Sequence, residues 1–388
     1  MKKIKLGIIG IGNMGSNYAT KVTQGECPDF ELVAVADVNP ARLKWAKENL
    51  KDNVTLFSTA EEMLDSGMLD ACMVETPHYV HPHYAMECMK RGIHVMIDKP
   101  AGVYTKQVRE MNECAKQHPE VVFAVMFNQR TNCVYKKMRE LVQSGKYGSI
   151  RRTNWIITDW YRPQVYYDSG SWRATWAGEG GGVLLNQSPH QLDLWQWICG
   201  MPKKVYANMK FGQWHDIEVE DDVTCFVEYE NGATGTFITT TGDACGSNRF
   251  EIQMDKAKLL VEHNQLHVWE FEMTEQEFSK TNQSPFGYPK AEELVIDLDG
   301  SNPQHVGVIN AWGGAILRGE ALVAEGAEGI HGLMLSNAMH LSGFTGNMVE
   351  LPFDEDLYYE ELEKRIRSSK KKEHVVEITA KMDQSWRR

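Results

Sequence analysis

The sequence predicts an α/β protein: an N-terminal Rossmann domain with a doubly wound parallel sheet, followed by an α+β domain with a large, open, mostly antiparallel sheet. Three observations support this prediction. Strand and helix signals alternate over the first 127 residues, a glycine-rich turn follows the first strand signal, and strand signals dominate after Arg130. We therefore expect one domain at residues 1–127 and a second at residues 128–388.

In the first domain, strand-like apolar runs alternate with helix starts. These starts are a cap residue before proline at 39–40, a Thr-x-x-Glu capping box at 59–62 and a His-Pro pair at 81–82. Such alternation places helices on both faces of a parallel sheet, with ligands at the carboxyl ends of its strands. The predicted strands are 4–9, 30–36, 55–57, 71–74, 95–97 and 121–126.

The first strand ends at a Gly-x-Gly-x-x-Gly pattern formed by Gly10, Gly12 and Gly15. Only residues without a Cβ fit where a strand turns sharply into a helix and backbone N–H groups approach a pyrophosphate. Glycine turns are common, so the pattern alone is weak, but a helix-compatible segment follows it at 14–22. We expect a dinucleotide to contact the three glycines together with Asn13 and Met14.

An acidic residue closes the second strand. Asp37 lies 22 residues after Gly15, where a carboxylate can accept hydrogen bonds from both ribose hydroxyls, and this favours NAD. The 2′-phosphate of NADP would face the same carboxylate, so NADP is disfavoured unless Arg42 offsets the repulsion.

The second domain begins with helix signals and continues as a series of strands. Helices are expected at 134–144 and within 183–199, and Asn231-Gly232 is typical of a hairpin turn. Residues 276–303 are predicted to form a loop with a short strand at 294–297. Helices at 305–318 and 330–342 are expected to pack on the sheet, and 368–374 to be a solvated tail. The other predicted strands are 205–211, 223–230, 233–241, 250–254, 258–261 and 267–271.

Composition narrows the function classes. The 41 basic and 53 acidic residues give a formal net charge of −12, which disfavours nucleic acid and anionic membranes as partners. The N-terminal apolar run is too short for a signal peptide, and no segment approaches the roughly 18 apolar residues that span a bilayer. The eight cysteines are scattered, so we expect reduced thiols in a cytoplasmic protein.

Lys99 is the first candidate for chemistry. It lies in Asp98-Lys99-Pro100, directly after the strand at 95–97, and a lysine at the carboxyl end of a parallel strand points into the ligand crevice. There it can bind a substrate hydroxyl, stabilise an alkoxide or relay a proton if its pKa is lowered. The alternative is an ordinary surface lysine.

His190 is the second candidate. It follows three consecutive glycines, Gly180–Gly182, which suggest a close approach of the chain to a ligand or to another backbone. In one continuous helix, Asn186 and His190 would share a face, and Asp193 would follow. If Ser188 instead caps a helix that starts at proline 189, the shared face is lost.

In either arrangement, His190 lies near a helix start, where neutral imidazole is favoured and can act as a general base. The alternative is a structural histidine buried in the core.

Several of these motifs occur together in a known family. They are Gly10, Gly12 and Gly15, Thr76-Pro77 followed by His81, Asp98-Lys99-Pro100, and the segment from Gly180 to Asp193. In this combination and order the chain resembles the Gfo/Idh/MocA oxidoreductases over residues 1 to about 350. The resemblance implies a Rossmann domain that binds NAD, and a C-terminal sheet that often builds homo-oligomers.

The resemblance also implies roles for single residues. Lys99 and His190 correspond to the catalytic pair, while Asn186 stands where the family usually has an aspartate, so it can only orient a hydroxyl by hydrogen bonds. His78, His81 and His83 could suggest a metal site, but family members use none there and structural roles are expected. The cofactor-binding residues implied in this region are Thr76, Pro77, His78, His81, Asp98 and Lys99.

The segment 155–176 suggests a sugar substrate. Flat aromatic faces suit the C–H faces of pyranose rings or an aromatic aglycone, and charged groups bind hydroxyls, although about half of these aromatics should fill the core or an interface. The family branch that looks most similar acts on sugars and glycosides, including glycoside 3-dehydrogenases and C-glycoside-oxidising enzymes. The expected substrate-binding residues are Lys99, Asp159, Tyr161, Arg162, Arg173, Asn186 and His190.

We therefore expect an NAD-dependent dehydrogenase that oxidises a secondary hydroxyl, at C3 of a sugar or glycoside, with no resident metal. Three alternatives remain: an inositol dehydrogenase, a glycosidase that retains NAD and acts by transient oxidation and elimination, and a non-catalytic NAD-responsive regulator. Net NADH production would indicate a dehydrogenase, whereas aglycone release without added NAD would indicate the glycosidase. Firm NAD binding without turnover on a panel of sugars would indicate the regulator.

Overall fold

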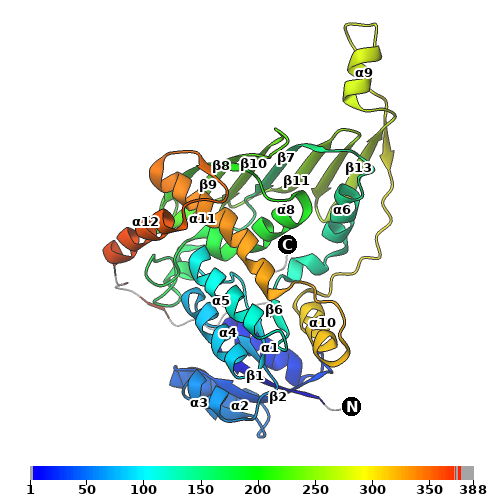
Figure 1. Cartoon of the computed structure of the whole chain (residues 1–388). Coiled ribbons are helices and arrows are strands. Elements are labelled where there is room, and N and C mark those ends of the chain that lie inside the picture. Colours follow the sequence, from blue (N-terminus) through cyan, green and yellow to red (C-terminus); the bar gives the residue numbers. More distant parts are fainter. Residues whose placement is uncertain (1–2, 371, 373–374, 377–388) are drawn as a thin grey trace.

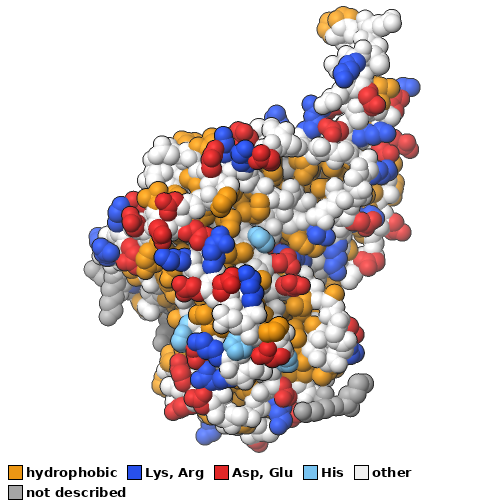
Figure 2. Space-filling model, viewed as in Figure 1, with side chains coloured by type: hydrophobic (Ala, Val, Ile, Leu, Met, Phe, Trp, Pro, Cys, Tyr) orange, Lys and Arg blue, Asp and Glu red, His pale blue; other side chains and the backbone are white. Residues whose placement is uncertain are grey.

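The computed structural model describes residues 3–370, 372 and 375–376. Its N-terminal part is a parallel sheet flanked by helices, and its C-terminal part is a wide sheet with helices on the face turned toward the first domain (Figure 1). The predicted fold class is confirmed. Charged side chains of both signs are interspersed over the face shown in Figure 2.

The first sheet has six parallel strands in the order β3-β2-β1-β4-β5-β6. The chain crosses from one side of β1 to the other between β3 and β4, so the crevice at the carboxyl ends of β1 and β4 is where a ligand is expected. The strands are β1 Ile4–Ile9, β2 Phe30–Ala36, β3 Thr55–Phe57, β4 Ala71–Val74, β5 His94–Ile97 and β6 Phe123–Val125. The helices are α1 Asn13–Thr23, α2 Pro40–Asn49, α3 Ala60–Asp65, α4 His81–Lys90 and α5 Thr105–Gln117.

The second sheet has nine strands in the order β14-β13-β12-β11-β7-β10-β9-β8-β15. The β7–β10 pair at its centre is parallel, and the other described pairs are antiparallel. The strands are β7 Ile150–Ile157, β8 Lys204–Phe211, β9 Glu220–Glu228, β10 Thr234–Thr240, β11 Asn248–Met254, β12 Ala257–Glu262, β13 Gln265–Phe271, β14 Ala291–Leu294 and β15 Val349–Glu350.

Helices α6 Cys133–Gln143, α8 Pro189–Cys199 and α11 Gly329–Thr345 lie on the face of the second sheet that is turned toward the first domain (Figure 1). The last of these contacts α8 and β8 on one side and α5 on the other. Asn337 of α11 accepts a hydrogen bond from the backbone N–H of Thr105 at 3.0 Å and donates one to the carbonyl of Val103 at 3.0 Å. The two domains are thereby joined by buried polar contacts as well as by a shared apolar core.

Helix α10, Gln304–Arg318, lies elsewhere than predicted. We expected it to pack on the second sheet, but Trp312 stacks on Phe30 of β2 with ring centroids 5.2 Å apart. Val308 and Ile309 join the same apolar cluster as the residues of β1. The prediction was wrong because an apolar helical face does not specify which of two sheets it will cover.

Three further α-helices in the described C-terminal part were not predicted. One is the short helix α7, Gln164–Asp168, which follows β7. Helix α9, Glu275–Thr281, lies in the segment interpreted as loop and projects from the body of the molecule (Figure 1). Helix α12, Glu355–Ser368, is rich in charged residues, and its buried residues are Tyr358 and Leu362. The expected tail at 368–374 overlaps the end of α12, and its residues 371 and 373–374 lie outside the described residues.

No helix in the described part of the chain is long and apolar enough to cross a bilayer.

Candidate functional site

The glycine turn after β1 brings three backbone segments into close contact. Gly10 has φ +90°, and a Cβ there would lie 2.7 Å from the carbonyl oxygen of Glu75. A Cβ on Gly15 would lie 1.9 Å from the carbonyl oxygen of Gly10. Gly12, the N-cap of α1, differs, because a Cβ there meets no atom within 4 Å and no side chain caps the helix. The helix N-terminus is therefore open to an anion on the side of Gly12.

Asp37 and Arg42 converge on this turn. The carboxylate of Asp37 accepts hydrogen bonds from the backbone N–H groups of Ile11 at 2.7 Å and Asn39 at 2.8 Å. The guanidinium of Arg42 donates to the carbonyl of Ile11 at 2.5 Å. Each carboxylate oxygen retains a further lone pair for a ribose hydroxyl, while Arg42 places a positive charge within reach of the same position.

In the described part of the chain, buried hydroxyls without hydrogen-bond partners lie near the carboxyl end of β4. The hydroxyls of Tyr18 and Thr76 are buried and have no hydrogen-bond partner among the described residues. Burial and the neighbouring Asp98 raise the pKa of Glu75 well above its usual value. Unpaired buried hydroxyls are rare in folded proteins, so an open helix N-terminus together with such atoms fits a bound dinucleotide.

His81 connects the two loops that border the crevice. Its ring nitrogens lie 2.8 Å from the carbonyl oxygen of Pro100 and 2.6 Å from that of Thr76. His78 is also buried, and its Nδ1 lies 3.3 Å from the carbonyl oxygen of Glu179. Among the described residues, no three His, Cys, Asp or Glu side chains are grouped as metal ligands. These histidines instead position backbone segments around the crevice.

Lys99 reaches from the end of β5 into the second domain. Its Nζ donates a hydrogen bond to the backbone carbonyl oxygen of Asn186 at 2.7 Å. Burial lowers the pKa of this ammonium, and the neighbouring Asp98 opposes that effect. The side chain lies within the site, which argues against an ordinary surface lysine.

The glycine run packs against other parts of the protein. A Cβ on Gly180 would lie 2.3 Å from Cγ1 of Val103, and a Cβ on Gly182 would lie 2.0 Å from the carbonyl oxygen of Glu220. The backbone N–H groups of Gly182 and Leu184 donate to the Glu220 carboxylate at 2.9 and 3.0 Å. Of the two explanations for the run, close approach to other parts of the chain is the one that the structure supports.

The expected helix within 183–199 is divided in two. Residues Val183–Gln187 form a π-helical turn, and α8 starts at Pro189 with Ser188 as its N-cap. The hydroxyl of Ser188 lies 2.8 Å from that of Thr239 and does not cap the helix. The continuous helix that would align Asn186 with His190 is thus wrong, and the start at Pro189 is correct. Single π-helical turns are frequent at functional sites.

His190 is the second residue of α8 and is buried. Neither ring nitrogen has a hydrogen-bond partner in the described chain. Burial lowers the pKa of His190 well below its usual value, and the charges of Lys99 and His305 act in the same direction. A neutral imidazole with two unpartnered nitrogens can accept a proton from a hydroxyl placed beside Lys99.

Asp193 has a structural partner. Its two carboxylate oxygens accept hydrogen bonds from Nη2 and Nε of Arg130 at 2.7 and 2.8 Å, and both side chains are 1% exposed. Arg130 also pairs with Glu328 at 2.6 Å. This buried ion pair holds α8 and therefore the backbone that carries His190.

The predicted substrate residues after β7 form a charged aromatic cluster. The Arg173 guanidinium lies over Trp172 and Tyr166, 4.6 and 4.7 Å from the ring centroids, and donates to the Tyr166 hydroxyl at 3.0 Å. Arg162 also lies over the Tyr166 ring at 5.2 Å, and its charge helps to lower the pKa of Lys99. The positive charges of Arg162 and Arg173 thus both act on Lys99.

Other members of the segment 155–176 divide between surface and core. Tyr161 is 40% exposed. Asp159 follows β7, and its charge helps to raise the pKa of the buried Tyr135. Trp155 is fully buried and stacks on Phe250 at 4.1 Å. The expectation that only some of these aromatics serve a ligand agrees with this division.

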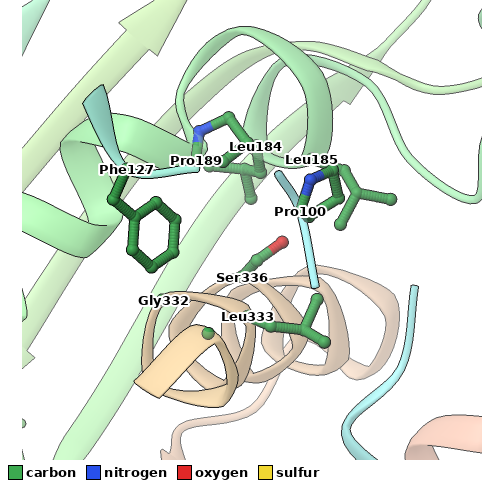
Figure 3. Close-up of a pocket in the computed structure, with 9 residues that line it drawn as sticks. Pro100, Phe127, Leu184, Leu185, Pro189, Gly332, Leu333 and Ser336 are labelled. Carbon is green, nitrogen blue, oxygen red and sulfur yellow. The ribbon is translucent and has the colours of Figure 1, made fainter. Parts of the chain in front are cut away.

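A small apolar pocket lies behind the two candidate catalytic residues. Pro100 follows Lys99 and Pro189 precedes His190, and both prolines line it (Figure 3). Residues of α11 form its opposite wall in Figure 3. Apart from one serine, its lining has no polar side chains. The pocket therefore lies in the packing of the two loops and does not suit a polyhydroxylated ligand. Its lining residues are Pro100, Phe127, Leu184, Leu185, Pro189, Gly329, Gly332, Leu333 and Ser336.

Sequence reasoning missed Glu179. It is 2% exposed, and its carboxylate accepts hydrogen bonds from the side-chain amide of Asn186 and the backbone N–H of Ala174. Burial raises its pKa, while Arg173 opposes that rise. The available signal was an acidic residue directly before the glycine run.

Comparison with protein families gives two matches along the chain. Residues 4–126 match the model described as "Oxidoreductase family, NAD-binding Rossmann fold". Residues 135–260 match the "GFO/IDH/MocA C-terminal domain". Together these segments account for well over half of the chain.

Individual relatives are distant in sequence, but their matches extend over more than half of this chain. The D-glucoside 3-dehydrogenase of Escherichia coli is 27% identical over 251 residues, which is 59% of this chain and 68% of that protein. The myo-inositol 2-dehydrogenase of Thermotoga maritima is 24% identical over 268 residues, 67% of this chain and 75% of that protein. For three other curated relatives, the matched part spans between 58% and 65% of their own length.

The fold also matches a solved structure. The WlbA dehydrogenase of Bordetella pertussis, crystallised with NADH and UDP-GlcNAcA, superposes with a TM-score of 0.76 at 26% identity. The match covers 91% of this chain and 100% of the other.

Proposed function

Because the chain belongs to the Gfo/Idh/MocA family of oxidoreductases with an NAD-binding Rossmann fold, we propose that it oxidises a secondary hydroxyl of a sugar or glycoside. One observation carries the proposal: a half-buried lysine and a buried histidine come from different domains, and the lysine's charge helps to lower the pKa of the histidine. Bound NAD would supply the hydride acceptor. We assign the cofactor to the open turn at Gly12, to Asp37 and to the loops that His81 connects.

His190 and Lys99 have different roles in the proposed alcohol oxidation. His190 accepts the hydroxyl proton, because its ring is neutral and both nitrogens lack partners within the described residues. Lys99 donates a hydrogen bond to the same oxygen and stabilises the negative charge that develops as the proton leaves. A free alkoxide at neutral pH is thereby avoided.

The substrate class is the finer part of the proposal. Arg162, Arg173 and Tyr166 form a surface on which a pyranose ring can stack and hydrogen-bond. A glucoside 3-dehydrogenase among the relatives favours C3 of a glucoside or C-glycoside. An inositol dehydrogenase among them favours a cyclic polyol as the second candidate. NADH absorbance during a screen of O- and C-glucosides, free hexoses and inositols tests both.

The outcome of that screen is decisive for the proposal. We expect NADH formation with at least one glycoside and slower or no turnover with inositols. Aglycone release without added NAD, or firm NAD binding with no turnover on any member of the panel, would contradict a dehydrogenase.

We further propose that the protein forms homo-oligomers through the open face of the second sheet. Tyr206 of β8 and Phe226 of β9 lie opposite one another in the register and are 42% and 37% exposed. Large apolar side chains exposed on a sheet favour association. Light scattering after size-exclusion chromatography would show a dimer or larger species, and Tyr206→Lys should shift it toward the monomer.

A further inference from the structure

Glu179 contacts three segments of the site but has no role in the reaction proposed above. Its Oε1 accepts a hydrogen bond from Nδ2 of Asn186, and its Oε2 accepts one from the backbone N–H of Ala174. Its own carbonyl oxygen lies 3.3 Å from Nδ1 of His78. A carboxylate that is 2% exposed is costly to bury, and these bonds hold it in one orientation.

Asn186 connects this carboxylate to Lys99. The side-chain amide of Asn186 is bound to Glu179, and the backbone carbonyl of the same residue accepts the Lys99 ammonium at 2.7 Å. Fixing the amide therefore fixes the carbonyl to which Lys99 is anchored. The π-helical turn that contains Asn186 has less regular backbone bonding than an α-helix, so a side-chain anchor matters more there.

Charges of both signs act on the pKa of Lys99. Burial lowers its pKa, and the positive charges of Arg173 and Arg162 lower it further. Asp98, on its own loop, and Glu179, from the second domain, are the carboxylates that act in the opposite direction. Removal of either weakens this compensation.

Glu179 has opposing neighbours of its own. Burial and the charge of Glu220 raise its pKa, while Arg173 and the hydrogen bonds from Ala174 and Asn186 lower it. The charge of Glu179 also acts on Lys372, from the C-terminal segment, whose pKa it raises. Both hydrogen bonds to the Glu179 side chain come from N–H donors, and a carboxylate accepts both.

We propose that Glu179 is a positioning residue, which through Asn186 holds the Lys99 ammonium directed at the reacting hydroxyl and supplies the carboxylate that an asparagine cannot. This inference rests on the proposed alcohol oxidation, in which Lys99 contacts the substrate oxygen. Asn186 serves as the connecting group, and the acid that stabilises the lysine comes from a position seven residues earlier in the chain.

The first experiment needs no substrate. Lys99 in the full-length protein is acetylated with limiting acetic anhydride at several pH values, and peptide mass spectrometry gives its rate relative to the exposed Lys44. In Glu179→Gln we expect Lys99 to react about 3- to 10-fold faster near neutral pH, because the amine loses a compensating charge and its anchor. The control Glu262→Gln, in β12 of the second sheet, should match the wild type. An unchanged Lys99 rate in Glu179→Gln overturns the proposal.

The second experiment measures turnover. Glu179→Gln should lower kcat about 10- to 100-fold with the KM for NAD unchanged. The exchange variant Glu179→Gln/Asn186→Asp restores one amide and one carboxylate across the same contact, and it should recover at least half of the lost factor on a logarithmic scale. Equal kcat values for the single and exchange variants would overturn the positioning role.

NAD binding monitored by protein fluorescence verifies that each variant is folded. If the wild-type protein oxidises no sugar, the proposed function fails, whereas the Lys99 labelling still decides the role of Glu179.

Discussion

The Nζ atom of Lys99 donates a hydrogen bond to the backbone carbonyl oxygen of Asn186 at 2.7 Å, and this contact joins the two domains at the candidate active site. Lys99 follows the fifth strand of the parallel sheet, whereas Asn186 lies in the π-helical turn before α8. Their contact brings His190, four residues further on, to the same crevice. Four predictions follow from this arrangement and its supports.

Asp37 should control the choice of cofactor. Asp37→Ala removes the acceptor for the ribose hydroxyls and leaves the Arg42 guanidinium beside the same position. Hydrogen bonds to a charged group contribute about 1.5–3 kcal/mol, so we expect the affinity for NAD to fall roughly 10- to 100-fold. Affinity for NADP should rise at the same time. Fluorescence titration with both cofactors measures the ratio, and an unchanged preference would contradict the assignment of Asp37.

The buried pair of Glu220 and His340 should be a major determinant of stability. Both side chains are 0% exposed, and Nε2 of His340 lies 3.0 Å from Oε2 of Glu220. The Glu220 carboxylate also accepts hydrogen bonds from the N–H groups at the start of the π-helical turn. Glu220→Ala leaves these donors unpaired, so the free energy of unfolding should fall by about 3–5 kcal/mol. Urea unfolding measures the loss. The matched control, Glu230→Ala in the exposed pair with Lys203, should behave as the wild type.

Buried histidines should make the protein less stable in acid. Burial lowers the pKa of His78, His81 and His190 below the unfolded value of 6.5, and lowers that of His305 to about 4. The unfolded chain therefore binds protons that the folded chain does not, as pH falls below about 6.5. Stability is full above that pH and declines below it. For His305 alone the loss approaches about 3 kcal/mol near pH 4.

Urea unfolding at a series of pH values measures this decline. His305→Gln should flatten the curve between about pH 6.5 and pH 4, because one group that titrates only in the unfolded state is removed. A curve for this variant that runs parallel to that of the wild type would show that His305 does not carry the effect.

The parallel sheet and the strands of the second sheet could be predicted because each depends on local pattern. Apolar runs, cap residues and glycine turns are read directly from neighbours in the sequence. The position of α10 could not be predicted in this way, because it depends on a contact between Trp312 and Phe30, which lie far apart in the sequence. Helix α12 was missed because charged residues hide a short apolar face, of which Tyr358 and Leu362 are the buried members.

In the candidate site, too, contacts between distant segments could not be predicted from the sequence. Lys99 and His190 were predicted from motifs, and the structure brings both to one crevice beside the glycine turn. The role of the glycine run remained open until the structure placed Gly182 against the backbone of Glu220. Glu179 could not be assigned from sequence, because a single acidic residue gains meaning only from the asparagine that it contacts.

In the proposed mechanism Lys99 and His190 carry out the chemistry of alcohol oxidation, and NAD affinity is not expected to depend on either of them. With a substrate identified by the screen, the most direct test measures NAD affinity and kcat for Lys99→Ala and His190→Ala beside the wild type. We predict NAD dissociation constants within about threefold of the wild-type value, and kcat lowered by roughly 10² to 10⁴ in each variant. A kcat within a factor of about three of the wild-type value in either variant would contradict the account.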